Sequence, residues 1–127
     1  MSLAALRQYQ TASTAAANGD ASSHQLVDML YAGVLERMAI ARGAAQRGER
    51  EAKRKAITGT LEIVSYLRAV LDHDRGGEIA RRLSALYDYI GTRLVQANAS
   101  DDVAALDEVA ALIREIRSAW EAVAPRR

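Results

Sequence analysis

Residues 78–98 read EIARRLSALYDYIGTRLVQAN, and this stretch sets the fold class. Its apolar residues return at steps of three or four, which keeps their side chains on one face of an α-helix. Such a register is typical of a helix that packs nearly parallel to its neighbours. The stretch therefore predicts one long helix of a bundle. The positions of the apolar stripe are Ile79, Leu83, Leu86, Ile90, Leu94 and Ala97.

Three further long helices are predicted on either side of this stretch. The first begins at a Ser22 or Ser23 cap and ends near Gln46, before Gly48. The second opens in the charged residues 49–55 and is broken by Gly76-Gly77. The last follows the polar residues 100–102 and ends near residue 123. The inward stripes are expected at Leu26, Leu30, Val34 and Met38, at Ile57, Leu61, Val64, Leu67 and Leu71, and at Val103, Leu106, Val109, Ile113, Ile116 and Trp120.

Short connections between long helices force neighbouring helices to run antiparallel. The single proline, Pro125, lies near the end, so no proline interrupts the predicted helices. We therefore predict an all-α protein, an antiparallel up-down four-helix bundle over residues 22–124. Leu3, Leu6 and Tyr9 recur at three-residue steps and predict a short additional N-terminal helix, with a loop, in residues 1–21.

Composition excludes several classes of function. Cysteine is absent, so disulfides, thiolate chemistry and Cys-ligated metals are excluded. A net charge of +1 is too near neutral to favour nucleic acid, which is not expected as a partner, and the run 47–55, which lacks aromatic residues, is interpreted as a solvated helix junction. No apolar run approaches the roughly 20 residues that span a bilayer, and no signal-peptide core precedes residue 20. The expected location is the cytoplasm, without membrane insertion.

The two histidines, His24 and His73, leave one rival function open. A bundle that binds di-iron needs two Glu-x-x-His pairs, and neither histidine has Glu three residues before it, so no metal or cofactor is expected. A histidine phosphotransfer bundle needs only one exposed histidine. His73 lies between Asp72 and Asp74, whose charges oppose a phosphoryl group, so two solvated histidines at helix ends are the favoured interpretation.

Several apolar residues lie beside or beyond the main stripes. A bundle helix usually carries an apolar stripe little wider than about 100°. Surplus apolar surface on two adjacent helices would form a groove for a partner helix. The alternative is an ordinary thick core in which tyrosine rings fill the ends of the bundle. The surplus residues are Met29, Ile40, Ile63, Tyr66, Val70, Tyr87 and Tyr89.

Four stretches resemble those of the FliS family of flagellin export chaperones, in order and at family spacing across about residues 22–120. Two positions depart from the family pattern, since His24 stands where proline is usual and Ala32 where aspartate is common. The stretches are SSHQLVDMLYAG at 22–33, LDHDRGGEIA at 71–80, LYDYI at 86–90 with AN at 97–98, and IRSAW at 116–120.

The resemblance implies a chaperone that catalyses no reaction. Its partner would be the C-terminal segment of flagellin, which is disordered before assembly and must not polymerise in the cytoplasm. The resemblance also implies delivery of this client to the flagellar export apparatus. A generic helical adaptor with another client remains an alternative.

Client contacts are expected mainly on the second predicted helix, which carries apolar residues on two sides. Gly33 and Gly59 would remove side-chain bulk where a client helix approaches. Tyr9 falls where the family carries a tyrosine. The predicted partner-binding residues are Tyr9, Leu30, Tyr31, Ile57, Leu61, Val64, Tyr66 and Leu71.

Overall fold

A computed structural model describes residues 20–122, and every regular element in this range is an α-helix. The predicted all-helical class is therefore confirmed for this part of the chain. The short helix predicted around Leu3, Leu6 and Tyr9 lies outside the described residues. The four helices are α2 (Asp20–Gln46), α3 (Arg50–Ala69), α4 (His73–Ala99) and α5 (Val103–Ala122).

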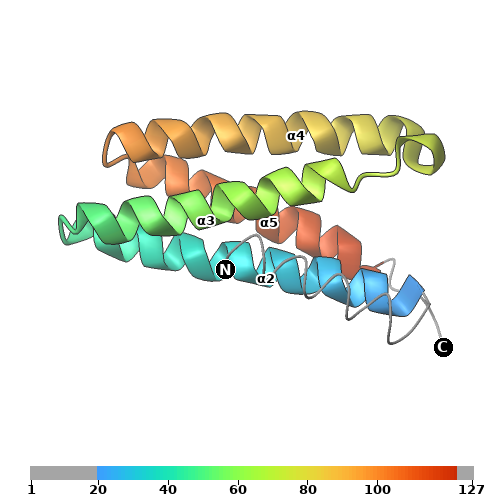
Figure 1. The fold of residues 1–127 in the computed structure, drawn as a ribbon, viewed down its shortest axis with the longest axis horizontal. Coiled ribbons are helices and arrows are strands. Elements are labelled where there is room, and N and C mark those ends of the chain that lie inside the picture. The colour runs from blue at the N-terminus through green and yellow to red at the C-terminus, as the bar shows by residue number, and fades with distance from the viewer. Residues whose placement is uncertain (1–19, 123–127) are drawn as a thin grey trace.

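The helices form a closed ring of contacts. Each one packs against its neighbours in the chain, and α2 also packs against α5. Figure 1 shows that successive helices run in opposite directions along the long axis. The connections cover only residues 47–49, 70–72 and 100–102, and such short connections produce this antiparallel order.

The core lies between the four helices and is almost entirely aliphatic. Its largest fully buried aliphatic side chains are at most 1% exposed, and burying each of them stabilises the fold by roughly 1.5–3 kcal/mol. Nearly all of them occupy positions that the helical spacing predicted as inward. They are Leu30 and Val34 of α2, Ile57 and Ile63 of α3, Ile90 and Leu94 of α4, and Leu106, Val109 and Ile113 of α5.

The end of α2 follows the predicted signal. Gly48 has φ of 70°, a left-handed conformation that glycine adopts without steric cost. This turn lets the Glu49 amide donate to the carbonyl of Ala44 at 2.9 Å, which satisfies an acceptor at the helix end. Gly48 therefore stops the first long helix, as the sequence predicted.

The predicted break at Gly76-Gly77 is present, but it lies near the start of α4 and not at the end of α3. α3 already ends at Ala69, and α4 begins at His73 behind Asp72, whose carboxylate accepts from the Arg75 amide at 3.0 Å. Gly77, with φ of 47° and ψ of −118°, is not helical and separates this first turn from the rest of α4 by a kink.

Ile79 is 68% exposed, so the prediction that it faces the core is wrong. It lies near the start of α4. Figure 1 shows that the C-terminal half of α5 diverges from α4 here and lies beside the N-terminal half of α2. The next residue, Ala80, is only 3% exposed and lies seven residues before the buried Tyr87, so the inward face of α4 passes through Ala80 and not through Ile79.

Candidate partner-binding surface

A groove of about 440 Å³ runs between α3 and α4 on the outside of the bundle. One side of α3 and one side of α4 line this groove, each over about two helical turns. We call this site the α3–α4 groove. It is lined by Leu61, Val64, Ser65 and Arg68 of α3 and by Tyr87, Asp88, Gly91, Thr92, Val95 and Gln96 of α4.

The α3–α4 groove suits an apolar ligand without charge. Val95 is 59% exposed at its rim, and Leu61 is partly exposed. The two charged lining residues pair with each other, since the Arg68 guanidinium lies 3.2 Å from the Asp88 carboxylate. The other polar lining residues, Ser65, Thr92 and Gln96, are uncharged. A partner would therefore bury an apolar, uncharged stripe here.

Two tyrosines form a hydrogen bond beneath this groove. The hydroxyls of Tyr31 and Tyr87 lie 2.7 Å apart and join α2 to α4. Both residues are 2% exposed, and burial raises the pKa of each hydroxyl. The pair is therefore a neutral polar link inside an aliphatic core.

The structure separates the predicted partner-binding residues into two groups. Leu61, Tyr66 and Leu71 are partly exposed and pack against the edge of the core. Four others are buried members of the core, which corrects the expectation that they form an open surface. These four are Leu30, Tyr31, Ile57 and Val64, and Tyr9 lies outside the described residues.

The space over Gly33 and Gly59 is already occupied, so these glycines do not leave the predicted open approach. The Arg37 side chain lies across both: a Cβ on Gly59 would stand 2.8 Å from Arg37 Nε, and one on Gly33 3.5 Å from Nη1. Arg37 Nη1 donates to the Gly33 carbonyl at 3.2 Å. Burial lowers the pKa of this guanidinium, and the charge of the nearby Glu62 opposes that effect. The two glycines therefore make room for an arginine between α2 and α3.

Gly91 differs from these glycines. It lies in the middle of α4 on the α3–α4 groove, and a Cβ built there meets no atom within 4 Å. Glycine inside a helix destabilises a fold by roughly 0.5–1 kcal/mol relative to alanine. Among the described residues, no neighbouring atom and no positive φ at this position excludes a larger residue.

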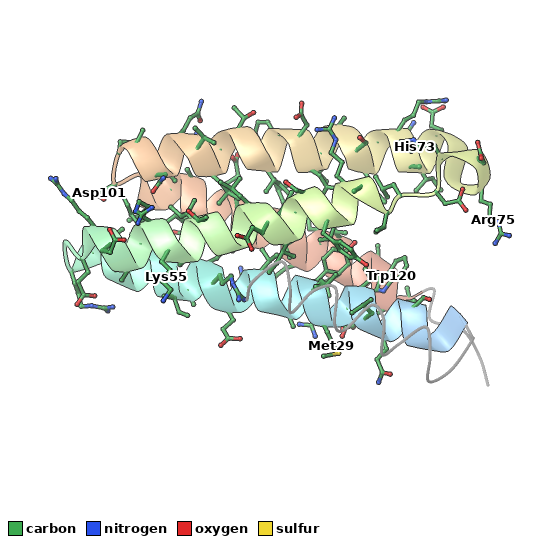
Figure 2. The ribbon with its side chains drawn as sticks, in the orientation of Figure 1. Met29, Lys55, His73, Arg75, Asp101 and Trp120 are labelled. Carbon is green, nitrogen blue, oxygen red and sulfur yellow. The ribbon has the colours of Figure 1, made fainter. Side chains whose placement is uncertain are left out.

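The first and last helices are tied together at the end of the bundle. The His24 ring stacks on the Trp120 indole with centroids 4.4 Å apart, and His24 Nε2 donates to the Trp120 carbonyl at 2.6 Å. Trp120 Nε1 in turn donates to the His24 carbonyl at 2.9 Å. Figure 2 shows Trp120 beside the N-terminal half of α2.

These contacts change the interpretation of His24. The residue is partly buried, so it is not the solvated histidine that the sequence suggested. Its Nε2, one of the two ring nitrogens that could accept a phosphoryl group, is already held by the Trp120 carbonyl. His73 is exposed at the start of α4, between Asp72 and Asp74 (Figure 2).

Asp28 and Arg117 strengthen the same junction. The Arg117 guanidinium donates to both carboxylate oxygens of Asp28, at 2.8 Å and 3.2 Å. These hydrogen bonds hold the pKa of Asp28 below its ordinary value. Such bidentate pairs have a fixed geometry and are the stronger kind of surface ion pair.

Lys53 is buried, although it stands in the run predicted as solvated. It is 5% exposed, and its Nζ lies 2.7 Å from the Asp101 carboxylate and 3.4 Å from the Asn98 carbonyl. The hydrogen bond from Lys53 lowers the pKa of Asp101. This lysine fixes the α4–α5 connection to α3, a role that no local sequence signal indicates.

Two negative findings concern residues 20–122 only. No helix in this range is long and apolar enough to cross a membrane. No group of three or more His, Asp or Glu side chains lies where it could hold a metal ion within the same range.

Comparison with known proteins gives the family. The model of the family described as flagellar protein FliS matches residues 5–127. The flagellar secretion chaperone FliSB of Pseudomonas aeruginosa is 44% identical over 119 residues, which cover 94% of each chain. The chaperone FliS of Vibrio cholerae is 38% identical over 94% of this chain and 88% of its own. FliS of Salmonella typhimurium is also 38% identical, over 95% of this chain and 90% of its own. The chain therefore belongs to the FliS family of flagellar secretion chaperones.

Proposed function

We propose that this chain is an export chaperone whose client is the C-terminal segment of flagellin. It would bind that segment in the cytoplasm, prevent premature polymerisation and help to deliver the client to the flagellar export apparatus. Membership of a family whose relatives are named flagellar secretion chaperones supports the general role. The α3–α4 groove is the structural observation that supports helix binding.

The physical requirements of such a client agree with this surface. A disordered segment that folds on binding can lay short amphipathic helices into apolar grooves. The α3–α4 groove offers exposed Val95 and partly exposed Leu61 between uncharged walls. Holding a client in this way requires no catalytic group, no metal and no cofactor.

We place the direct client contacts inside the α3–α4 groove at Leu61 and Val95. Tyr66 and Leu71 are partly exposed but do not line the groove, so we propose them as contacts of the client beyond it. The buried members would act indirectly, because they hold α3 and α4 in the positions that form the α3–α4 groove. A substitution at Ile57 or Val64 would therefore reduce stability first and client binding only as a consequence.

The N-terminal segment is proposed to compete with the client. Leu3, Leu6 and Tyr9 would pack on the bundle as an internal ligand, and a chain that starts at about Ser22 would then bind flagellin at least as tightly. If Tyr9 contacts the client instead, the same truncation weakens binding. Circular dichroism of the truncated chain controls for loss of helix.

The test of client identity is co-elution from a sizing column. The chain is mixed with full-length flagellin from the same organism, and a matched sample contains flagellin without its C-terminal segment. A 1:1 complex with the first and none with the second is expected, with a large negative heat capacity change in calorimetry from apolar burial and coupled folding. No complex with intact flagellin rejects the proposal.

A further inference from the structure

Gly91 is the one helical glycine within residues 20–122 at which an added Cβ would meet no atom within 4 Å. Gly48 and Gly77 adopt positive φ, a conformation that other residues rarely adopt. The remaining helical glycines each face a side chain where a Cβ would stand 3.5 Å or less from its nearest atom. These are Gly33 and Gly59 against Arg37, Gly43 against Arg47, and Gly76 against Ala80.

Gly91 lies on the wall of the α3–α4 groove, between Asp88 one turn before it and Val95 one turn after it. A Cβ at this position would project into open space. Alanine would favour the helix there and would collide with nothing in the free chain. A glycine in such a place leaves the helix backbone bare on the surface, which suits a ligand or another backbone that approaches closely.

We infer that Gly91 is the point of closest approach between α4 and a helix of the client. This inference rests on the proposed function and identifies the contact that determines how deeply the client helix sits in the α3–α4 groove. The spacing of packed helices depends on the side chains at their contact, and a glycine permits the smallest separation. Leu61 and Val95 then contact the apolar stripe of the client on either side.

The charge pattern of the α3–α4 groove favours this occupant. Arg68 and Asp88 neutralise each other, and the Arg68 Nε also donates to Ser84 at 3.1 Å. The other walls carry only uncharged side chains, so the complementary ligand is an apolar stripe without charge. An amphipathic client helix presents such a stripe, with its own charged side chains directed toward solvent.

The test compares Gly91→Ala and Gly91→Leu with the wild-type full chain. Ala85→Leu is the matched control, because Ala85 is also exposed on α4 but does not line the α3–α4 groove. Binding to the flagellin C-terminal segment is measured by calorimetry, the melting temperature by circular dichroism, and self-association by sedimentation.

The expected result separates stability from binding. Gly91→Ala raises the melting temperature of the free chain by about 2–6 °C, because it removes a helix-destabilising residue. Gly91→Leu weakens client binding about tenfold or more, since its side chain fills the space needed for close approach. Ala85→Leu binds the client as the wild type does.

Each of the other possible results would reject either the proposed function or the inference about Gly91. If the wild-type chain does not bind the segment, the proposed function fails. If the wild type binds and Gly91→Leu binds equally well, the inference about Gly91 fails. If Gly91→Leu lowers the melting temperature of the free chain, position 91 is packed inside the molecule and is not open to a client helix, and the inference about Gly91 fails. A change in self-association alone would assign the groove to a second copy of the chain.

Discussion

The hydrogen bond between Tyr31 and Tyr87 gives a direct test of which tyrosines belong to the core. Each hydroxyl is the only hydrogen-bond partner that the other has among the described residues, and both side chains are 2% exposed. Tyr31→Phe removes one hydroxyl without changing the ring, so it leaves the Tyr87 hydroxyl buried without a partner. Tyr87→Phe does the reverse.

The expected loss of stability follows because each hydroxyl depends on the other for its hydrogen bond. A buried polar group left without a partner costs roughly 1–3 kcal/mol, so each single substitution lowers the free energy of unfolding by about 2 kcal/mol. The double substitution removes both hydroxyls, leaves no unpaired group and costs about 1 kcal/mol or less. The two sites therefore couple by about 3 kcal/mol, although they are 56 residues apart in sequence.

Urea unfolding of the four proteins measures this coupling. The chain has a single tryptophan, Trp120 at the α2–α5 junction, so its fluorescence and the circular dichroism at 222 nm report on unfolding independently. At about 2 kcal/mol, each single variant should also melt roughly 8–16 °C lower than the wild type.

Single substitutions that cost less than about 0.5 kcal/mol and add in the double variant would refute this reasoning. Such a result would mean that water reaches both hydroxyls through the α3–α4 groove. Tyr31 would then return to the set of candidate client contacts.

Three further predictions concern the partner-binding face and the two helix junctions. Tyr66→Ala should weaken client binding by about 1–2 kcal/mol in calorimetry, and a large fall in melting temperature would assign Tyr66 to the core instead. Gly59→Ala should destabilise the wild-type chain but stabilise an Arg37→Ala background by about 0.5–1 kcal/mol in urea unfolding, because the collision with the Arg37 side chain at 2.8 Å is then absent. The lowered pKa of Asp28 means that its pairing with Arg117 stabilises the fold above about pH 4 and is lost as the pH falls through the folded-state pKa. Asp28→Asn should therefore reduce the loss of stability between pH 7 and pH 3, and an unchanged profile would contradict this cause.

The helices and most core positions could be predicted because helical spacing is a local signal. The stripe of α5 illustrates this, since Leu106, Val109 and Ile113 were expected inward and are at most 1% exposed. Ile79 satisfied the same rule and is exposed, because its neighbour Ala80, 3% exposed, occupies the inward position at this level of α4. Steps of three and of four both keep a residue near one helical face, so spacing alone does not choose between two adjacent apolar positions.

The residues of the candidate site were harder to predict than the helices, because they too depend on how the helices pack. Apolar stripes wide enough to suggest a groove also describe a thick core, and Leu30, Tyr31, Ile57 and Val64 proved to be core. Lys53 is a charged residue in a charged run, and only the position of Asp101 on a distant connection explains its burial.

The signals that could have located the α3–α4 groove were present but inconspicuous. Val95 stands outside the inward stripe of α4, and Gly91 interrupts an otherwise favourable helix sequence. A glycine inside a helix, one turn from an apolar residue on the outer face, indicates a surface where a partner can approach the backbone closely. The open space around Gly91, which the other described helical glycines lack, is visible only in the structure.

Hydrogen exchange of the full-length chain, free and bound to the flagellin C-terminal segment, tests most directly whether the α3–α4 groove holds the client. Mass spectrometry of peptides covering residues 61–68 and 87–96 is compared with peptides from the α2–α5 side. Slower exchange in the two groove segments on binding is expected, with little change over residues 35–45 and 103–112. Protection of the α2–α5 side with unchanged exchange in both groove segments would contradict the assignment of the α3–α4 groove as the client site.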